Sequence, residues 1–175
     1  EALAATLDGF TRTPRPVADP DGGELHLQNL AFDHRGLHLV GLDFNDRETE
    51  VFQGELGVLH DVPGGTLPWL VASAATYPGR APGSVLLFSH IPMHPGPFGQ
   101  DGMSALRAVL GPHEGTIAAN VAGHLHLGYE TSVPGLFPVY VTAATWVGEL
   151  SIRLIDVGHD GQGFVHTTET VVIPS

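Results

Sequence analysis

The chain has 175 residues, of which 42% are hydrophobic, which fits a single domain with a buried core. Its formal net charge of −12, from 19 acidic residues against 7 arginines and no lysine, excludes a nucleic-acid backbone or an anionic membrane surface as the expected partner. The absence of cysteine rules out disulfides and thiolate metal sites and leaves the compartment undetermined, and no apolar run reaches the roughly 20 residues of a membrane span.

The first third of the chain predicts a helix, a loop and a hairpin. Residues 1–7 favour a helix that ends at Gly9, and the prolines and glycines of residues 11–23 indicate a loop. Residues 25–30 and 37–43 alternate as two strands joined by a turn at 33–36. The histidines at 26, 34 and 38 fall on polar positions of this hairpin and are expected to be exposed or packed. Residues 43–46 fit either a carboxylate cluster or a turn, and the turn is favoured.

The middle third predicts two strands that each end in histidine. After an irregular stretch at 51–65, residues 67–77 have the pattern of an amphipathic helix. Residues 85–89 form an apolar strand that leads to His90. The proline- and glycine-rich residues 92–99 predict a loop that carries His94 over the strand ends, and 104–110 predict a short helix before Gly111. Residues 116–122 predict the strand that delivers Gly123-His124-Leu125-His126.

The last third predicts three strands, at residues 138–144, 149–157 and 164–172. The final two are joined by a glycine-rich turn at 158–163. Their β-branched, alternating pattern predicts a second sheet of sequential antiparallel strands. His159 and His166 lie in this region, and neither is expected at a functional site.

His90, His124 and His126 are the candidate metal ligands. All three follow apolar strands, and Gly123 and Gly128 bracket the last two, where they would let the backbone turn sharply. Loops at strand ends are where open α/β sheets carry their chemistry. The imidazole is a common ligand for Zn, Fe and Mn, so these positions predict a metal site.

These motifs resemble the calcineurin-like metallophosphoesterase superfamily. Members close their site with a strand ending in His-x-Pro, as at His90-Ile91-Pro92, and a later strand ending in Gly-His-x-His, as at residues 123–126. Residues 39–43, Leu-Val-Gly-Leu-Asp, look like the family's strand ending in Leu-Asp. Residues 66–70, Thr-Leu-Pro-Trp-Leu, look like its helix with a Trp-Leu pair. The resemblance covers roughly residues 25–157.

The family's upstream motifs are absent from this sequence. No Asp is followed two places later by His, no Gly-Asp dipeptide occurs, and none of the three asparagines lies in Gly-Asn-His. In the family these motifs supply the bridging carboxylate and the histidine that contacts the phosphate or leaving group. The resemblance therefore implies that residues 1–175 are the C-terminal portion of a single metallophosphoesterase domain.

The resemblance implies an α/β fold, a calcineurin-like phosphoesterase sandwich of two mixed β-sheets flanked by helices, with the N-terminal part missing. It implies two divalent or trivalent metal ions (Mn, Fe or Zn). His90 and His124 would bind one ion and His126 the other, and His94 would lie in the substrate pocket. The implied activity is metal-dependent hydrolysis of a small-molecule phosphomonoester or phosphodiester. No catalytic residue is identifiable here, so the chain alone is expected to be inactive. We expect the missing N-terminal half as its partner, in the same polypeptide or as a separate chain.

Two alternatives remain open. The chain also fits a catalytically incompetent family member or fragment that acts as a binding or regulatory module, because every carboxylate ligand is absent. It fits, too, an unrelated histidine-rich domain in which His90, His124 and His126 bind one zinc ion.

Overall fold

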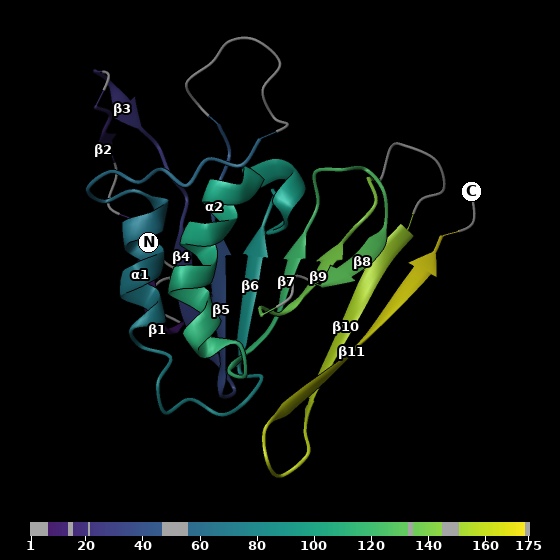
Figure 1. The fold of residues 1–175 in the computed structure, drawn as a ribbon. Helices are drawn as coiled ribbons and strands as arrows, with labels where there is room; N and C mark the ends of the chain where they lie inside the picture. The colour runs from purple at the N-terminus through teal and green to yellow at the C-terminus, as the bar shows by residue number, and fades with distance from the viewer. Residues whose placement is uncertain are drawn as a thin grey trace.

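The computed structural model describes residues 7–13, 16–20, 22–46, 56–132, 135–144 and 151–173. Within them a seven-stranded mixed sheet forms the centre of the fold, in the order β1-β4-β5-β6-β7-β9-β8 (Figure 1). Its strands are β1 (Asp8–Arg12), β4 (Leu30–His34), β5 (Leu37–Leu42), β6 (Val85–Ser89), β7 (Ile117–Ala122), β8 (Tyr129–Ser132) and β9 (Pro138–Val141). The neighbours β5, β6, β7 and β9 run parallel, so their carboxyl ends meet at one edge.

Two helices cover one face of this sheet, as Figure 1 shows: α1 (Thr66–Ala74) and α2 (Pro95–Leu110), the latter followed by the 3₁₀ turn η1 (Gly111–His113). Alternate residues of the strands, such as Val85 and Leu87 of β6, enter the main core beneath the helices. Their neighbours Leu86 and Phe88 point to the opposite face, because successive strand residues alternate. No helix in the described ranges is long and apolar enough to cross a membrane.

The opposite face is covered in part by a long antiparallel hairpin, β10 (Ser151–His159) and β11 (Phe164–Val172). Val157 of β10 packs against a small cluster built on Leu86, Ala118 and Ala119. A separate two-stranded piece pairs β2 (Val17–Ala18) with β3 (Glu24–Leu25). The mixed α/β class predicted from the sequence is therefore present, with one large mixed sheet and few helices.

Three sequence-based predictions of local structure were wrong. The first hairpin strand is β4 rather than residues 25–30. The proline-rich loop after Pro92 becomes helical from Pro95, because proline is favoured in a first helical turn, and non-helical Gly99 kinks α2. Residues 138–141 join the main sheet as β9 instead of pairing with β10. The helix expected over residues 1–7 lies almost wholly outside the described residues, and β1 begins directly after it.

Candidate functional site

Four histidines from two loops surround one pocket at the carboxyl ends of β6 and β7. His90 directly follows β6, His94 precedes α2, and His124 and His126 lie in the loop that follows β7. Together with Gly96, Pro97 and Leu125 they line a pocket of about 720 Å³. The structure thus brings together all three predicted metal ligands and the predicted substrate-binding residue.

The rings of His90 and His124 lie close together in this pocket. Their centroids lie 5.3 Å apart, with planes at 79°. Burial lowers the pKa of His90 below its ordinary value, and the neighbouring His124 and His126 lower it further. The shift favours the neutral imidazole, which is the form that binds a metal ion.

His124 and His126 both adopt left-handed backbone conformations, with φ of 74° and 58°. Such conformations cost a non-glycine residue about 1–2 kcal/mol, and they concentrate at functional sites. The sequence argument placed the sharp turn at the flanking glycines, but Gly123 and Gly128 have no positive φ. A Cβ on Gly123 would make only ordinary contacts, 3.7 Å from His90 Nδ1 and 3.9 Å from Thr142 Oγ1. The strain of the turn therefore falls on the histidines themselves.

Asn120 supports the loop that carries His90 and His94, and sequence reasoning did not identify it. This fully buried side chain of β7 accepts a hydrogen bond from the Met93 backbone N at 3.0 Å. Its Nδ2 donates to Ser89 Oγ at 3.0 Å and weakly to the Leu87 carbonyl at 3.4 Å. A polar residue inside the apolar run of residues 117–122 was the available signal, because a buried amide needs specific partners.

His94 has a hydrogen bond on each ring nitrogen. Nδ1 accepts from the backbone N–H of Gly96 at 3.1 Å, and Nε2 lies 2.6 Å from Tyr129 Oη. Tyr129 is the first residue of β8 and is half-buried. Burial lowers the pKa of His94, with a further contribution from His124, and burial raises the pKa of Tyr129.

The fit to metal ions is partial. The donor chemistry is suitable, since neutral imidazoles bind Mn, Fe and Zn. However, in the part of the chain that the structure describes, no group of three or more His, Cys, Asp or Glu side chains is placed to hold an ion. The described residues that line the histidine pocket include no carboxylate. A complete site would need further ligands.

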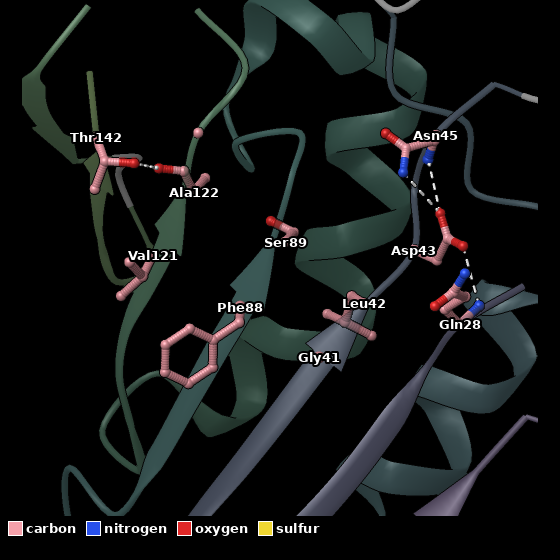
Figure 2. Close-up of a pocket in the computed structure, with 11 residues that line it drawn as sticks. Gln28, Gly41, Leu42, Asp43, Asn45, Phe88, Ser89, Val121, Ala122 and Thr142 are labelled. Atoms are coloured by element: carbon pink, nitrogen blue, oxygen red, sulfur yellow. Dashed lines mark hydrogen bonds between the residues drawn. The ribbon is translucent and has the colours of Figure 1, made fainter. Parts of the chain in front are cut away.

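A second, more open pocket lies beside the histidines on the sheet face opposite the helices. Its volume is about 570 Å³, and Phe88 and Val121 form part of its lining (Figure 2). At one end, Asp43 accepts hydrogen bonds from the backbone N of Gln28 at 3.0 Å and from Asn45 Nδ2 at 3.0 Å. A longer bond of 3.3 Å joins Asp43 Oδ1 to the Asn45 backbone N, which is the pattern of an Asx turn. The side-chain pattern expected of a turn is therefore present at Asp43, but residues 43–46 form no backbone turn, and Asn45 pairs with Gly57 in an isolated antiparallel bridge.

Comparison with solved structures gives distant likenesses to this chain. No family model matches the chain, and no curated protein matches it. A dimetal phosphatase from Danio rerio is similar at 19% identity and a TM-score of 0.44, over 62% of this chain and 46% of that one. A hypothetical protein from Thermus thermophilus is similar at 12% identity and a TM-score of 0.41, over 90% of this chain and 66% of that one. The chain thus spans about half the length of the first, and at such scores neither likeness establishes an activity.

Proposed function

We propose that this chain supplies the histidine half of a dinuclear metal site that hydrolyses a phosphate ester. The observation that carries this proposal is the gathering of His90, His94, His124 and His126 around one pocket. They come from loops after two neighbouring parallel strands, where α/β sheets carry their chemistry. The left-handed conformations of His124 and His126 add support, because strain of this kind persists at functional sites.

The chain's own residues would bind the ions and orient the ester. His90 and His124 would hold one ion and His126 the other, with their neutral imidazoles as donors. His94 would lie at the ester's phosphoryl or leaving group. Two ions of Mn, Fe or Zn would supply Lewis-acid activation and the positive charge that this acidic chain lacks.

The remaining ligands would come from an N-terminal half carried by the same polypeptide or by a separate chain. Two observations support this part of the proposal. Among the described residues, no carboxylate lines the histidine pocket. The adjacent open pocket presents half-buried Phe88 and Val121 on a sheet face that the helices do not cover. An apolar sheet face favours a packed partner. Ligands on such a partner would approach the histidines from this side.

One observation favours the binding or regulatory module as a second candidate. No group of His, Cys, Asp or Glu within the described ranges is placed to hold an ion. A catalytically incompetent member would keep the pocket and lack the ions, and it would purify with little metal.

The decisive experiment measures metal content and ester hydrolysis together. Two proteins are compared: the chain alone, and the chain joined to an N-terminal segment that carries Asp, Asn and His ligands. Each is incubated with added Mn²⁺ and either a p-nitrophenyl phosphodiester or the corresponding monoester. We expect hydrolysis only from the joined protein, and its loss in His90→Ala. Hydrolysis by the chain alone would contradict the half-site arrangement. A joined protein that binds Mn²⁺ equally well with and without His90 would refute the assigned ligands.

A further inference from the structure

A separate cavity lies at the opposite end of the parallel strands from the histidine pocket. Its volume is about 360 Å³, and residues of β1, β4, β5 and α1 line it, on one side of the sheet (Figure 1). His38, one of these residues, pairs with Val85 at the start of β6, whereas His90 follows the end of that strand. At roughly 3.3 Å per strand residue, the two sites are about 16 Å apart along the sheet. The cavity is therefore distinct from the candidate metal site.

Three polar side chains form a charge-balanced group in this cavity. Asp33 Oδ1 accepts hydrogen bonds from His38 Nδ1 at 2.8 Å and from Arg80 Nη1 at 2.9 Å. Burial acts to raise the pKa of Asp33, but the hydrogen bonds from Arg80 and His38 outweigh it and hold the pKa below its ordinary value. Burial lowers the pKa of His38, so its imidazole is neutral at neutral pH. One carboxylate and one guanidinium therefore balance each other.

This ion pair leaves one acceptor and one donor open. Among the described residues, both side-chain hydrogen bonds of Asp33 end on Oδ1, and Oδ2 has none. In the same ranges Arg80 uses Nη1 alone, and because its Nε is buried, Nη2 is the donor left for a ligand. The side chains of Asp33 and Arg80 are 34% and 24% exposed, so a ligand can reach them.

Gly9 keeps Asp33 Oδ2 uncovered. A Cβ at residue 9 would lie 2.6 Å from Oδ2, closer than a Cβ approaches such an atom, and the φ of 62° also favours glycine. β1 has a shift in register between Asp8 and Thr11 as it passes Asp33. Irregularities of this kind are frequent beside functional sites. The edge of the sheet is thus shaped around an open carboxylate oxygen.

We propose that this cavity binds a neutral, hydroxyl-rich molecule about the size of a monosaccharide. A hydroxyl both donates and accepts, so two neighbouring hydroxyls can bond to Asp33 Oδ2 and to Arg80 Nη2 at once. An anion would meet the carboxylate and a cation the guanidinium, so the balanced pair favours an uncharged ligand. Trp69 gives the cavity an apolar wall for the carbon side of such a molecule. Pockets for small ligands range over about 300–1,000 Å³, which includes this one.

Binding is tested by titrating the full chain with D-glucose, D-galactose and D-mannose in the presence of a chelator. The Trp69 indole and Thr76 amide signals are followed in ¹H–¹⁵N spectra, because both residues line the cavity. We expect saturable shifts with at least one sugar. Its 6-phosphate and its 2-amino derivative, which carry opposite charges, should each bind roughly tenfold more weakly. No saturable shift with any of the three sugars, or equal binding of the charged derivatives, would overturn the proposal.

Two substitutions test the location of the site. Ala72→Leu fills the cavity from an exposed position of α1 without touching the ion pair, and it should weaken sugar binding by roughly tenfold. Its matched control is Ala75→Leu, at the exposed end of α1 and outside the lining.

Asp33→Asn places an amide nitrogen where a carboxylate oxygen is and should also weaken binding, whereas Asp156→Asn, on an exposed position of β10, should not. Unchanged binding in either Ala72→Leu or Asp33→Asn, or equal losses in the two controls, would overturn the assignment. Neither metal ions nor hydrolysis enters these measurements, so the phosphate-ester proposal stands or fails separately.

Discussion

The imidazole rings of His90 and His124 meet edge to face, 5.3 Å apart, although they follow different strands. Parallel pairing of β6 with β7 produces this contact, since Ser89 lies opposite Ala122 and the two loops leave the sheet side by side. Gly123 N also donates to the His90 carbonyl at 3.1 Å. The contact is the geometric basis of the metal-site hypothesis.

Replacement of either histidine should therefore weaken metal binding. His90→Ala and His124→Ala are each expected to reduce Mn²⁺ or Zn²⁺ affinity by more than about tenfold, because even outer partners of a ligand contribute that much. Isothermal titration calorimetry measures the affinity. His26→Ala serves as the control, since its exposed side chain lies beside Glu24, outside the pocket. Equal losses in all three variants would reject the assignment.

The left-handed backbone of His126 predicts that this candidate metal ligand lowers the stability of the fold. His126→Gly should raise the free energy of unfolding by up to about 1 kcal/mol, because glycine adopts a positive φ without steric cost. His126→Val should lower it by a similar amount. Urea denaturation measures both. Leu125→Gly is the control, because Leu125 has no positive φ, and glycine there should destabilise. Equal destabilisation by glycine at both positions would show that the loop is unstrained.

Asn120→Ala should affect both the fold and the site. It would leave the Met93 N–H without its buried acceptor, at a cost of about 1–3 kcal/mol in the free energy of unfolding. The loop from His90 to His94 would lose its anchor, and metal affinity should fall with stability. Ser89→Ala, which removes a single Nδ2 partner, should cost less. If Asn120→Ala is destabilised but keeps its full metal affinity, Asn120 stabilises the fold without positioning the metal ligands.

His38 should make stability depend on pH. Burial lowers its pKa below the ordinary value, and Arg80 adds to this, while the hydrogen bond to Asp33 opposes it. Below the ordinary pKa of about 6.5 the unfolded chain binds the proton more readily than the folded chain does. Stability should therefore fall as the pH drops through 6.5 towards the folded pKa.

His38→Asn tests this dependence, because the asparagine amide can still donate to Asp33 Oδ1 as Nδ1 does at 2.8 Å. The unfolding free energy of the original chain minus that of the variant should be larger at pH 8 than at pH 5.5. Chemical denaturation at both values measures it. A difference that does not change with pH would show that His38 titrates alike in the two states.

Arg153 should hold the β10–β11 hairpin against the sheet. Its Nη1 donates to Glu130 Oε1 at 2.5 Å, and its guanidinium lies 5.4 Å from the centre of the Tyr140 ring. The side chain is 5% exposed, so Arg153→Met removes the charge while much of the packing remains. We expect faster hydrogen exchange across β10 and β11, with β5 and β6 unchanged. Uniform acceleration throughout the chain would indicate global destabilisation instead.

The sequence predicted the site's strands better than its loops. Residues 85–89 and 117–122 are apolar apart from Ser89 and Asn120, and such a pattern is typical of a buried parallel strand, so both were placed within a residue. The helix at Thr66–Ala74 also followed from its apolar spacing. Residues 95–98 were misjudged because the same prolines that break a helix interior are favoured in its first turn.

The position of β9 was not visible in the sequence. Residues 138–141 alternate like the later strands, and local pattern alone does not identify the pairing partner. Tyr129 and Asn120 were missed for a related reason. Their importance lies in contacts to His94 and Met93, which are brought near only by the folded sheet.

The strand order β7-β9-β8 means that the sheet is completed out of sequence. The loop with His124 and His126 leaves β7 and enters β8, yet both of these strands pair with β9, which is synthesised after them. Until β9 inserts between them, the ends of that loop have no fixed separation. Such non-local pairing is slow to form. A nascent chain that stops before residue 138 would thus carry every histidine of the pocket and the β6–β7 pairing that brings His90 to His124, but it would lack the strand that fixes where their loop enters β8.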